Sequence, residues 1–268
     1  MAHVTLADGT VIRPLATHEE RANAVRLQDA IWGAGFSEKV PAALLLVAEK
    51  TGGVAAGAFS PTGALVGFVF GLTGVRDGAL IHWSDILAVL PEARGRRLGE
   101  ALKRYQRERC RAIGVQRMYW TYDPFVARNA HLNLNVLGAR VDEFVPDMYG
   151  VATNSPMHGS LGTDRFVAVW PVATDPVRLS GDPGTLAGAP VVAGPGVDLP
   201  SFPDVRSVVV RIPRDYATLL AGDAAAARAW RHGARRAFQH YLSRGYAVTA
   251  FVAEPPGDAS YVLSNTSR

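Results

Sequence analysis

Apolar residues in the first fifty positions recur at helical intervals. After residue 20 they return every three or four residues, which is the period of an amphipathic helix. Thr17 and Glu20 have the spacing of a capping box, so we expect a helix over 18–32. Pro41 suits the first turn of a second helix, which would continue through Ala48.

Three apolar runs follow and predict three neighbouring strands. Residues 54–59 and 64–71 flank a Pro-Thr-Gly turn, so we expect them to form a hairpin. The third run, 82–90, ends at Pro91. Proline cannot donate to a strand ladder, and we therefore place the end of this strand there.

The next stretch of chain alternates helical and strand-like patterns. It predicts a helix over 98–113, a strand over 115–122, a short helix over 129–137, and strands over 141–145 and 165–170. The full order is a strand, two helices, three strands, a helix, a strand, a short helix and two strands. This order predicts a mixed α/β (α+β) fold.

The composition changes after this point. Residues 173–204 are rich in Pro and Gly and read as an irregular connector. A strand over 205–212, a mostly helical stretch over 215–244, a strand over 245–252 and an edge over 261–263 then form a smaller α/β extension. We therefore predict a first domain over 1–172, a connector over 173–204 and an extension over 205–268.

Composition and charge fit an ordinary globular chain. Of the 268 residues 48% are hydrophobic and 19% are charged, and the formal net charge is +4. Lysine occurs only at Lys39, Lys50 and Lys103, so arginine carries most of the positive charge. Two readings stay open: codon usage of the genome, or affinity for phosphates and carboxylates, which the guanidinium group matches. Since no dense basic run with interleaved aromatics occurs, we expect no nucleic-acid partner.

Three absences bound the compartment and the cofactors. Cys110 is the single cysteine, which excludes a disulfide framework and a cysteine-ligated metal site, and we predict no metal. Asp and Arg near the N-terminus replace the apolar block of an export signal. The longest apolar run, 40–48, is far below the roughly 20 residues that span a bilayer. We expect a cytoplasmic protein without a membrane segment.

The most informative stretch is 87–103, LAVLPEARGRRLGEALK. A strand ends in proline, and a glycine-containing basic turn leads into a helix. The first N–H groups of a helix have no intrahelical partner and, with the helix dipole, favour an anion such as a pyrophosphate. Gly95 and Gly99 would let the ligand approach the backbone. The alternative is a plain basic helix start that binds nothing. Walker-type and dinucleotide-binding motifs are missing.

This stretch resembles the acyl-CoA loop of the GNAT acetyltransferase superfamily. The superfamily pattern is Arg or Gln, two residues, Gly, one residue, then Gly or Ala, after a strand that ends in Val-x-Pro. The chain departs from it at Arg97, where the middle Gly is usual. The element order of residues 1–172 is also similar, and segment 120–139 resembles a less-characterised subgroup of predicted acetyltransferases.

The resemblance implies a GNAT-like, mixed and mostly antiparallel central sheet flanked by helices, with acetyl-CoA or another acyl-CoA as cosubstrate. It also implies that a backbone N–H near Ala88–Val89 binds the oxyanion and that the short helix at Asn129 flanks the pantetheine arm. The cofactor-binding residues implied in this way are Leu87, Ala88, Val89, Arg94, Gly95, Arg96, Arg97, Leu98, Gly99 and Asn129.

Acyl transfer to an amine requires a neutral nucleophile, a stabilised oxyanion and a protonated leaving thiolate. For the base we predict Asp85, although a structural carboxylate is an equal alternative. His82 is the reserve, and strand alternation places it on the opposite face from Asp85. For the acid we predict Tyr149, with Tyr122 and His131 as alternatives, because Leu134 occupies the position where related enzymes often carry a tyrosine.

Polar residues beyond the loop are candidates for acceptor binding. We predict that Tyr122, Asp123 and Arg165 contact the substrate, with the arginine pairing a carboxylate. Several arginines of the C-terminal helix would form a solvated face; the other reading lets one or two of them reach the acceptor.

The sequence thus predicts an N-acyltransferase that moves an acetyl or other short acyl group, with succinyl as an alternative, to a small-molecule amine such as an amino acid. The extension would cover the acceptor side or form a homodimer interface. The alternative is a non-catalytic CoA-binding sensor or interaction module with the same fold.

Overall fold

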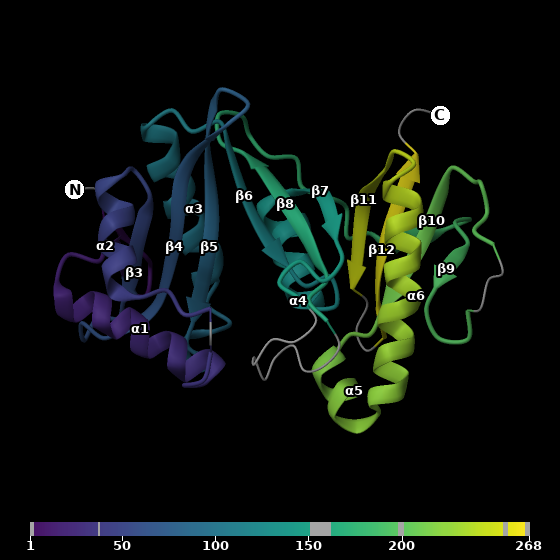
Figure 1. Ribbon diagram of the computed structural model, residues 1–268, viewed down its shortest axis with the longest axis horizontal. Helices are drawn as coiled ribbons and strands as arrows, with labels where there is room; N and C mark the ends of the chain where they lie inside the picture. Colours follow the sequence, from purple (N-terminus) through teal and green to yellow (C-terminus); the bar gives the residue numbers. More distant parts are fainter. Residues whose placement is uncertain (1–2, 37, 151–161, 198–200, 254–256, 266–268) are drawn as a thin grey trace. The chain divides into compact units, whose positions relative to one another are not determined.

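The computed structural model describes residues 3–36, 38–150, 162–197, 201–253 and 257–265. These residues form two compact units (Figure 1). The first contains 3–120 and 170–175, and the second contains 121–150, 162–169 and 176–265. The division differs from the predicted boundaries at 172 and 204, which stay a prediction about domains.

The first unit is built from short N-terminal strands, three α-helices and a large sheet. Its elements are β1 (Val4–Thr5), β2 (Val11–Pro14), α1 (His18–Trp32), α2 (Ala42–Lys50), β3 (Val54–Phe59), β4 (Leu65–Arg76), β5 (Ala79–Val89), the 3₁₀ turn η1 (Pro91–Ala93), α3 (Leu98–Ala112) and β6 (Arg117–Tyr122), whose last two residues cluster with the second unit.

The sheet of the first unit is mixed and mostly antiparallel. Its strand order is β1-β2-β3-β4-β5-β6, and each neighbouring pair through β5 is antiparallel. The pair β5–β6 is parallel. The predicted fold class is therefore confirmed, with one correction: the N-terminal stretch forms the hairpin β1–β2, not a single strand, because a turn at Gly9 reverses the chain.

Helices cover both faces of this sheet. Phe68 and Phe70 of β4 belong to one buried cluster with residues of α1 and α2. The alternate β4 residues point to the other face, where a β-carbon on Gly67 would touch Leu102 of α3. The helix starts follow their predicted signals: Thr17 and Glu20 form the capping box of α1, and Pro41 precedes α2.

The second unit combines the strand pair β7–β8 of the middle of the chain with the C-terminal extension. Its elements are α4 (Ala127–Ala130), the π-helical turn η2 (His131–Leu137), β7 (Arg140–Val145), β8 (Arg165–Pro171), the 3₁₀ turn η3 (Pro183–Leu186), β9 (Val191–Ala193), β10 (Ser207–Ile212), α5 (Tyr216–Gly222), α6 (Ala224–Leu242), β11 (Tyr246–Ala253) and β12 (Ala259–Asn265).

Two features of the extension were not predicted. The connector contributes β9, which pairs in parallel with β10 in a sheet of order β11-β12-β10-β9. The mostly helical stretch expected over 215–244 consists of two helices, α5 and α6, because the Asp223 side chain accepts hydrogen bonds from the N–H groups of Ala225 and Ala226 and starts α6 anew.

An aromatic cluster joins the extension to strands β7 and β8. Phe166 of β8 lies at the centre, with ring centroids 5.6 Å from Phe144 of β7, 4.7 Å from Phe238 of α6 and 5.4 Å from Tyr261 of β12. These rings meet mostly edge to face, the arrangement that aromatic pairs favour. The shared core explains why residues 121–150 and 162–169 cluster with the extension.

Within the described ranges, none of the helices is both long enough and apolar enough to cross a bilayer.

Gly71 of β4 tests the packing between the sheet and α3. A β-carbon there would lie 2.3 Å from His82 Nε2 and 2.5 Å from the Trp83 carbonyl oxygen. We expect Gly71→Ala to lower the free energy of unfolding by about 2 kcal/mol or more, because the site has no space for a methyl group. Urea unfolding measures this change.

Gly74→Ala on the same strand is the matched control, because no heavy atom lies within 4 Å of its β-carbon position. We expect that variant to stay within about 0.5 kcal/mol of the wild type. Equal losses in the two variants would contradict the packing described above.

Candidate functional site

The predicted loop has two residues in the left-handed region. Gly95 has φ 80°, and Arg97 has φ 58° and ψ 19°. Such backbone angles cost little for glycine and about 1–2 kcal/mol for other residues. Gly95 therefore adopts its backbone conformation without strain, whereas Arg97 adopts one that glycine would favour.

Helix α3 begins without a side-chain cap. Its first backbone bond joins the Ala101 N–H to the Arg97 carbonyl oxygen. Within the described part of the chain, the N–H groups of residues 95–99 have no hydrogen-bond partner. Free donors at the positive end of a helix dipole form a ready anion site. The loop therefore presents the donors that a diphosphate needs.

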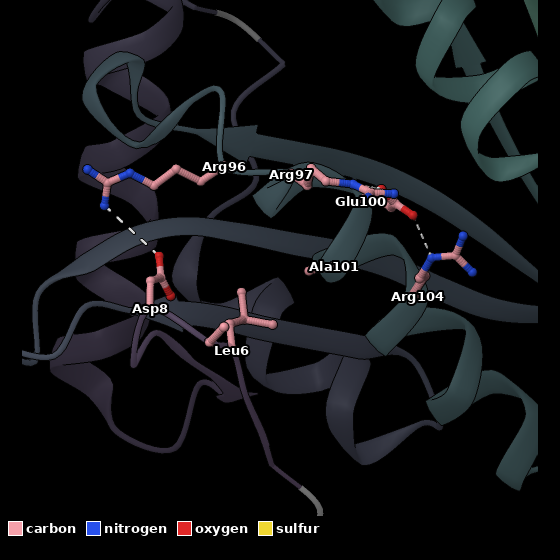
Figure 2. Close-up of a pocket in the computed structure, with 8 residues that line it drawn as sticks. Leu6, Asp8, Arg96, Arg97, Glu100, Ala101 and Arg104 are labelled. Carbon is pink, nitrogen blue, oxygen red and sulfur yellow. Dashed lines mark hydrogen bonds and ion pairs between the residues drawn. The ribbon is translucent and has the colours of Figure 1, made fainter.

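The loop arginines already have protein partners. Arg94 Nε donates to the Val89 carbonyl oxygen over 3.2 Å, and Arg96 lies 4.0 Å from Asp8. Arg97 and Arg104 each donate to Glu100 over 2.8 Å (Figure 2). Although burial disfavours a charged Glu100, these two arginines hold its pKa below the ordinary value. An incoming anion would compete with carboxylates for these side chains.

A pocket of about 500 Å³ lies beside the loop (Figure 2). Leu6, Ala7 and Asp8 from the β1–β2 turn line one side. The opposite side is lined by Arg96, Arg97, Glu100, Ala101 and Arg104. The pocket is thus lined by apolar side chains and by charged groups of both signs.

Strand β5 is paired on one side only near the loop. It pairs with β6 from Ile81 to Trp83, and the described residues show no further pair between these strands. The Leu90 N–H points toward β4 and donates to the Val66 carbonyl oxygen. Because donors of an antiparallel strand alternate in direction, the N–H groups of Leu87 and Val89 point away from β4. These groups are open to a ligand.

Asp85 lies at a β-bulge of β5. Phe70 pairs with Ile86 and Gly71 pairs with Ser84, so Asp85 has no partner on β4. Part of the residue is exposed to solvent, while surrounding atoms partly desolvate its carboxyl group. Loss of solvation, and then the nearby Glu38, raise the pKa of Asp85 above its ordinary value. A carboxylate with a raised pKa can accept a proton near neutral pH better than an unperturbed one.

The sequence did not indicate that the Glu38 carboxylate lies near enough to influence Asp85. Glu38 follows α1 in the loop to α2, and its position depends on the buried Gln28. That side chain accepts from the Val40 N–H over 2.8 Å and donates to the Val40 carbonyl oxygen over 3.0 Å. The sequence shows a polar residue inside a helix, and only the fold shows what it binds.

His82 is buried, and both of its ring nitrogens are engaged. The Thr73 hydroxyl donates to the Gly52 carbonyl oxygen over 2.7 Å and accepts from His82 Nδ1 over 3.0 Å. Nε2 accepts from the Gln106 amide over 3.0 Å. Burial, and then the nearby Lys103, lower the pKa of His82 to about 4. The reserve base of the sequence prediction therefore lies in the interior, away from solvent.

The hydrogen-bond chain continues to Lys103 of α3. Ser84 Oγ donates to the Gln106 side-chain oxygen and accepts from Lys103 Nζ, both over 2.7 Å. The Lys103 amine also lies 3.9 Å from the centre of the Trp120 ring. Burial lowers the pKa of this amine from 10.5 to about 7. The sequence prediction missed Lys103, although it shares one helix face with Gln106 and Cys110.

In the second unit Tyr149 keeps an accessible phenol. Its side chain is 40% exposed, and its hydroxyl lies 3.1 Å from Thr121 Oγ1. The guanidinium group of Arg165 lies 5.5 Å from the centre of its ring. His131 is exposed and Tyr122 is buried. Burial raises the pKa of the Tyr122 hydroxyl strongly, which makes it a poor acid at neutral pH.

Asp123 and Arg165 lie in a buried ionic network. Asp123 accepts from Arg231 over 2.8 Å and lies 3.9 Å from Arg165. Arg235 donates to Asp147 and Asp164 over 2.6–3.0 Å. The predicted contact of Tyr122, Asp123 and Arg165 with substrate stays a prediction, but all three residues are more than nine-tenths buried, and Asp123 pairs with both Arg165 and Arg231 of α6.

The basic residues of the C-terminal helix differ in exposure, and the expected contact of one or two arginines with the acceptor stays a prediction. Arg228, His232 and Arg236 are exposed, as expected of a solvated face. Arg231 and Arg235 instead turn inward to aspartates.

Asn129 lies on α4, as the resemblance implies for the residue beside a pantetheine arm. Its side chain is half-buried, and its backbone N–H bonds to the Val126 carbonyl oxygen. Leu134 is fully buried in η2. In the described ranges, no group of three or more His, Cys, Asp and Glu residues is arranged to hold a metal.

Comparisons by sequence and by structure give different results. No protein-family model matches the chain. No curated protein matches it either. Solved structures with a similar arrangement of elements include GNAT acetyltransferases.

Three of these structures illustrate the likeness. A phosphinothricin acetyltransferase of the GNAT superfamily from Sinorhizobium meliloti, in complex with acetyl-CoA, is 19% identical and has a TM-score of 0.48 over 63% of this chain and 93% of its own. A GNAT-family acetyltransferase from Streptococcus pneumoniae is 15% identical, with a TM-score of 0.48 over 60% and 99%. The ribosomal-protein-S18-alanine N-acetyltransferase from Escherichia coli is 15% identical, with a TM-score of 0.48 over 64% and 99%.

The left-handed conformation of Arg97 gives a test of the loop geometry. We expect Arg97→Gly to be about 1 kcal/mol more stable to urea than Arg97→Ala, because glycine adopts these angles without strain. Both variants lose the bond to Glu100, whose contribution is small since Arg97 is 76% exposed. Equal stabilities of the two variants would contradict the left-handed geometry.

Lys103 gives the protein an unusual dependence of stability on pH. In the folded chain its amine is mostly neutral above pH 7, whereas in the unfolded chain it stays protonated up to about 10.5. Unfolding therefore takes up a proton in this window, and stability rises with pH by up to about 1.4 kcal/mol per unit.

Lys103→Met should remove this slope. The difference in unfolding free energy between wild type and variant should change by about 2 kcal/mol between pH 7 and 9 in favour of the wild type. The window stops at pH 9 because burial raises the pKa of Cys110 to about 12, and that thiol has the opposite effect at higher pH. A constant difference would show that Lys103 does not titrate in this range.

Proposed function

We propose that the protein is an N-acyltransferase that moves an acetyl or other short acyl group from acyl-CoA to an amine. The observation that carries the proposal is the run of unpartnered N–H groups at residues 95–99, placed directly after the one-sided end of β5. The donors suit a diphosphate, and the open edge of β5 suits the amide-containing pantetheine arm.

The reaction follows from the groups around β5. The amine nitrogen attacks the thioester carbonyl carbon, and the Leu87 or Val89 N–H donates to the resulting oxyanion. Asp85 takes the proton of the attacking nitrogen, directly or through water. The C–S bond then breaks, and the thiolate leaves as CoA after protonation. For this acid we keep Tyr149, whose phenol is accessible to solvent.

For the acceptor we propose a small molecule with a cationic amine. Glu38 and Asp85 are two carboxylates close enough to raise the pKa of Asp85, and such a pair favours a positively charged ligand. Proteins of similar fold include enzymes named for a small molecule and for a ribosomal-protein alanine, so peptide N-termini belong in the same substrate panel. A succinyl donor is tested beside acetyl-CoA.

Calorimetric titration with CoA and acetyl-CoA tests the cofactor. We expect binding with a Kd below 1 mM, because free backbone donors and helix dipole act together on the diphosphate. Gly99→Pro removes one of these N–H donors and should weaken binding at least tenfold. Pantetheine, which lacks the diphosphate, should bind equally to both proteins.

A thiol-release assay over amines and peptides tests catalysis. We expect Asp85→Asn to lower kcat by about 10²–10⁴-fold with CoA affinity unchanged, since it removes only the proton acceptor. Tyr149→Phe should lower kcat without changing the KM of the amine. Tight CoA binding without turnover would favour the non-catalytic sensor instead.

A further inference from the structure

Lys103 is a buried amine that the reaction proposed above does not use. Only 3% of the residue is exposed. No carboxylate lies within salt-bridge distance in the described part of the chain. Lysine is almost never fully buried without such a partner, because removing an ammonium group from water costs several kcal/mol. A methionine of similar length would fill the same space without that cost.

The Lys103 amine is one end of a chain of hydrogen bonds between α3 and β5. Lys103 Nζ donates to Ser84, Ser84 donates to Gln106, and Gln106 donates to His82. Trp120 covers the amine from β6. Each link has one assigned direction, so the chain holds β5 against α3 with a fixed pattern of donors.

These hydrogen bonds join α3 to β5 at Ser84, the residue next to the bulge. Ser84 is the last regular partner of β4 before Asp85, and its Oγ lies between two bonds of 2.7 Å from α3. Gly71, opposite Ser84, lacks a side chain, and His82 Nε2 and Gln106 Nε2 fill the space that one would need. A bulge is otherwise a weakly paired part of a strand.

We propose that Lys103 is a positioning residue, which acts through Ser84 to hold the bulge that presents Asp85. This inference rests on the proposed role of Asp85 as the base. Lys103 itself touches no reacting atom. Its burial costs stability, which is a common property of residues that serve a site.

Carbon-13 titration of the Asp85 carboxyl tests the proposal without CoA or an acceptor. This titration therefore gives a result even if no transfer activity is found. Loss of solvation is the main cause of the raised pKa of Asp85. If the hydrogen bonds of Ser84 to Lys103 and Gln106 are lost, we expect the bulge to become more hydrated, and the pKa of Asp85 should then fall toward its ordinary value.

Ser84→Ala is the decisive variant, because it interrupts the chain of hydrogen bonds and keeps the Lys103 amine. We expect the Asp85 pKa to fall in Ser84→Ala and in Lys103→Met. We expect no change in Lys50→Met, which removes an exposed lysine of α2. An unchanged pKa in Ser84→Ala would overturn the proposal, whether or not Lys103→Met folds.

The direction of change in Lys103→Met separates two roles. If Lys103 acted on Asp85 only as a distant positive charge, its removal would raise the Asp85 pKa. If Lys103 instead holds the bulge through its hydrogen bond to Ser84, its removal lowers that pKa. A rise, or no change beside a fall in Ser84→Ala, would show that Lys103 does not position the bulge. Thermal unfolding at pH 7 gives an independent readout: Lys103→Met should raise Tm, whereas a residue kept only for stability would lower it.

Kinetics complete the test where transfer occurs. Lys103→Met and Ser84→Ala should lower kcat about tenfold or more, with the KM of acyl-CoA unchanged, because the loop at residues 95–99 stays in place. A change in KM alone would assign Lys103 to cofactor binding and overturn its positioning role.

Discussion

The uncapped start of α3 is the constraint on which the account depends. A helix normally satisfies its first N–H groups with a side chain, yet Arg97 enters α3 in the left-handed region and offers none. The Glu100 side chain nearby is held by Arg97 and Arg104 and does not turn back to the amides. The donors of residues 95–99 are therefore left for a ligand, and glycine at two of these positions keeps their approach open.

The same helix fixes the strand that would carry the chemistry. Leu102 packs on the sheet, and one turn of polar side chains beside it, from Lys103 to Gln106, binds β5 just before its bulge. One element thus sets both the anion-binding donors and the carboxylate of Asp85. Local polar contacts in a packed interior are costly, and here they coincide with the place where a reactive group must be held still.

Local signals in the sequence predicted most elements of the fold. The capping box at Thr17 and the proline after β5 each act through neighbouring residues and were found in the structure as expected. The bulge at Asp85 was not predicted, because it depends on the register of β4. The short strand β9 was missed for a similar reason: it exists only through its pairing with β10.

The site was predictable only where its groups are neighbours in the chain. Loop 94–99 could be recognised from its own residues. The predicted contact of Asp123 with the substrate stays a prediction, and its partner Arg231 lies more than one hundred residues away, so that no local pattern indicates this pair. Glu38 and Lys103 were overlooked because a charged residue in a loop or on an arginine-rich helix usually faces water.

The central claim is that the backbone amides of residues 95–99 bind the diphosphate of CoA. Nitrogen-15 spectra recorded during titrations with CoA and with pantetheine test it most directly. The account predicts that CoA shifts the amide signals of Gly95, Arg97 and Gly99, and that pantetheine, at the same saturation, leaves them in place. Signals that stay fixed with saturating CoA, or that move equally with pantetheine, would contradict it.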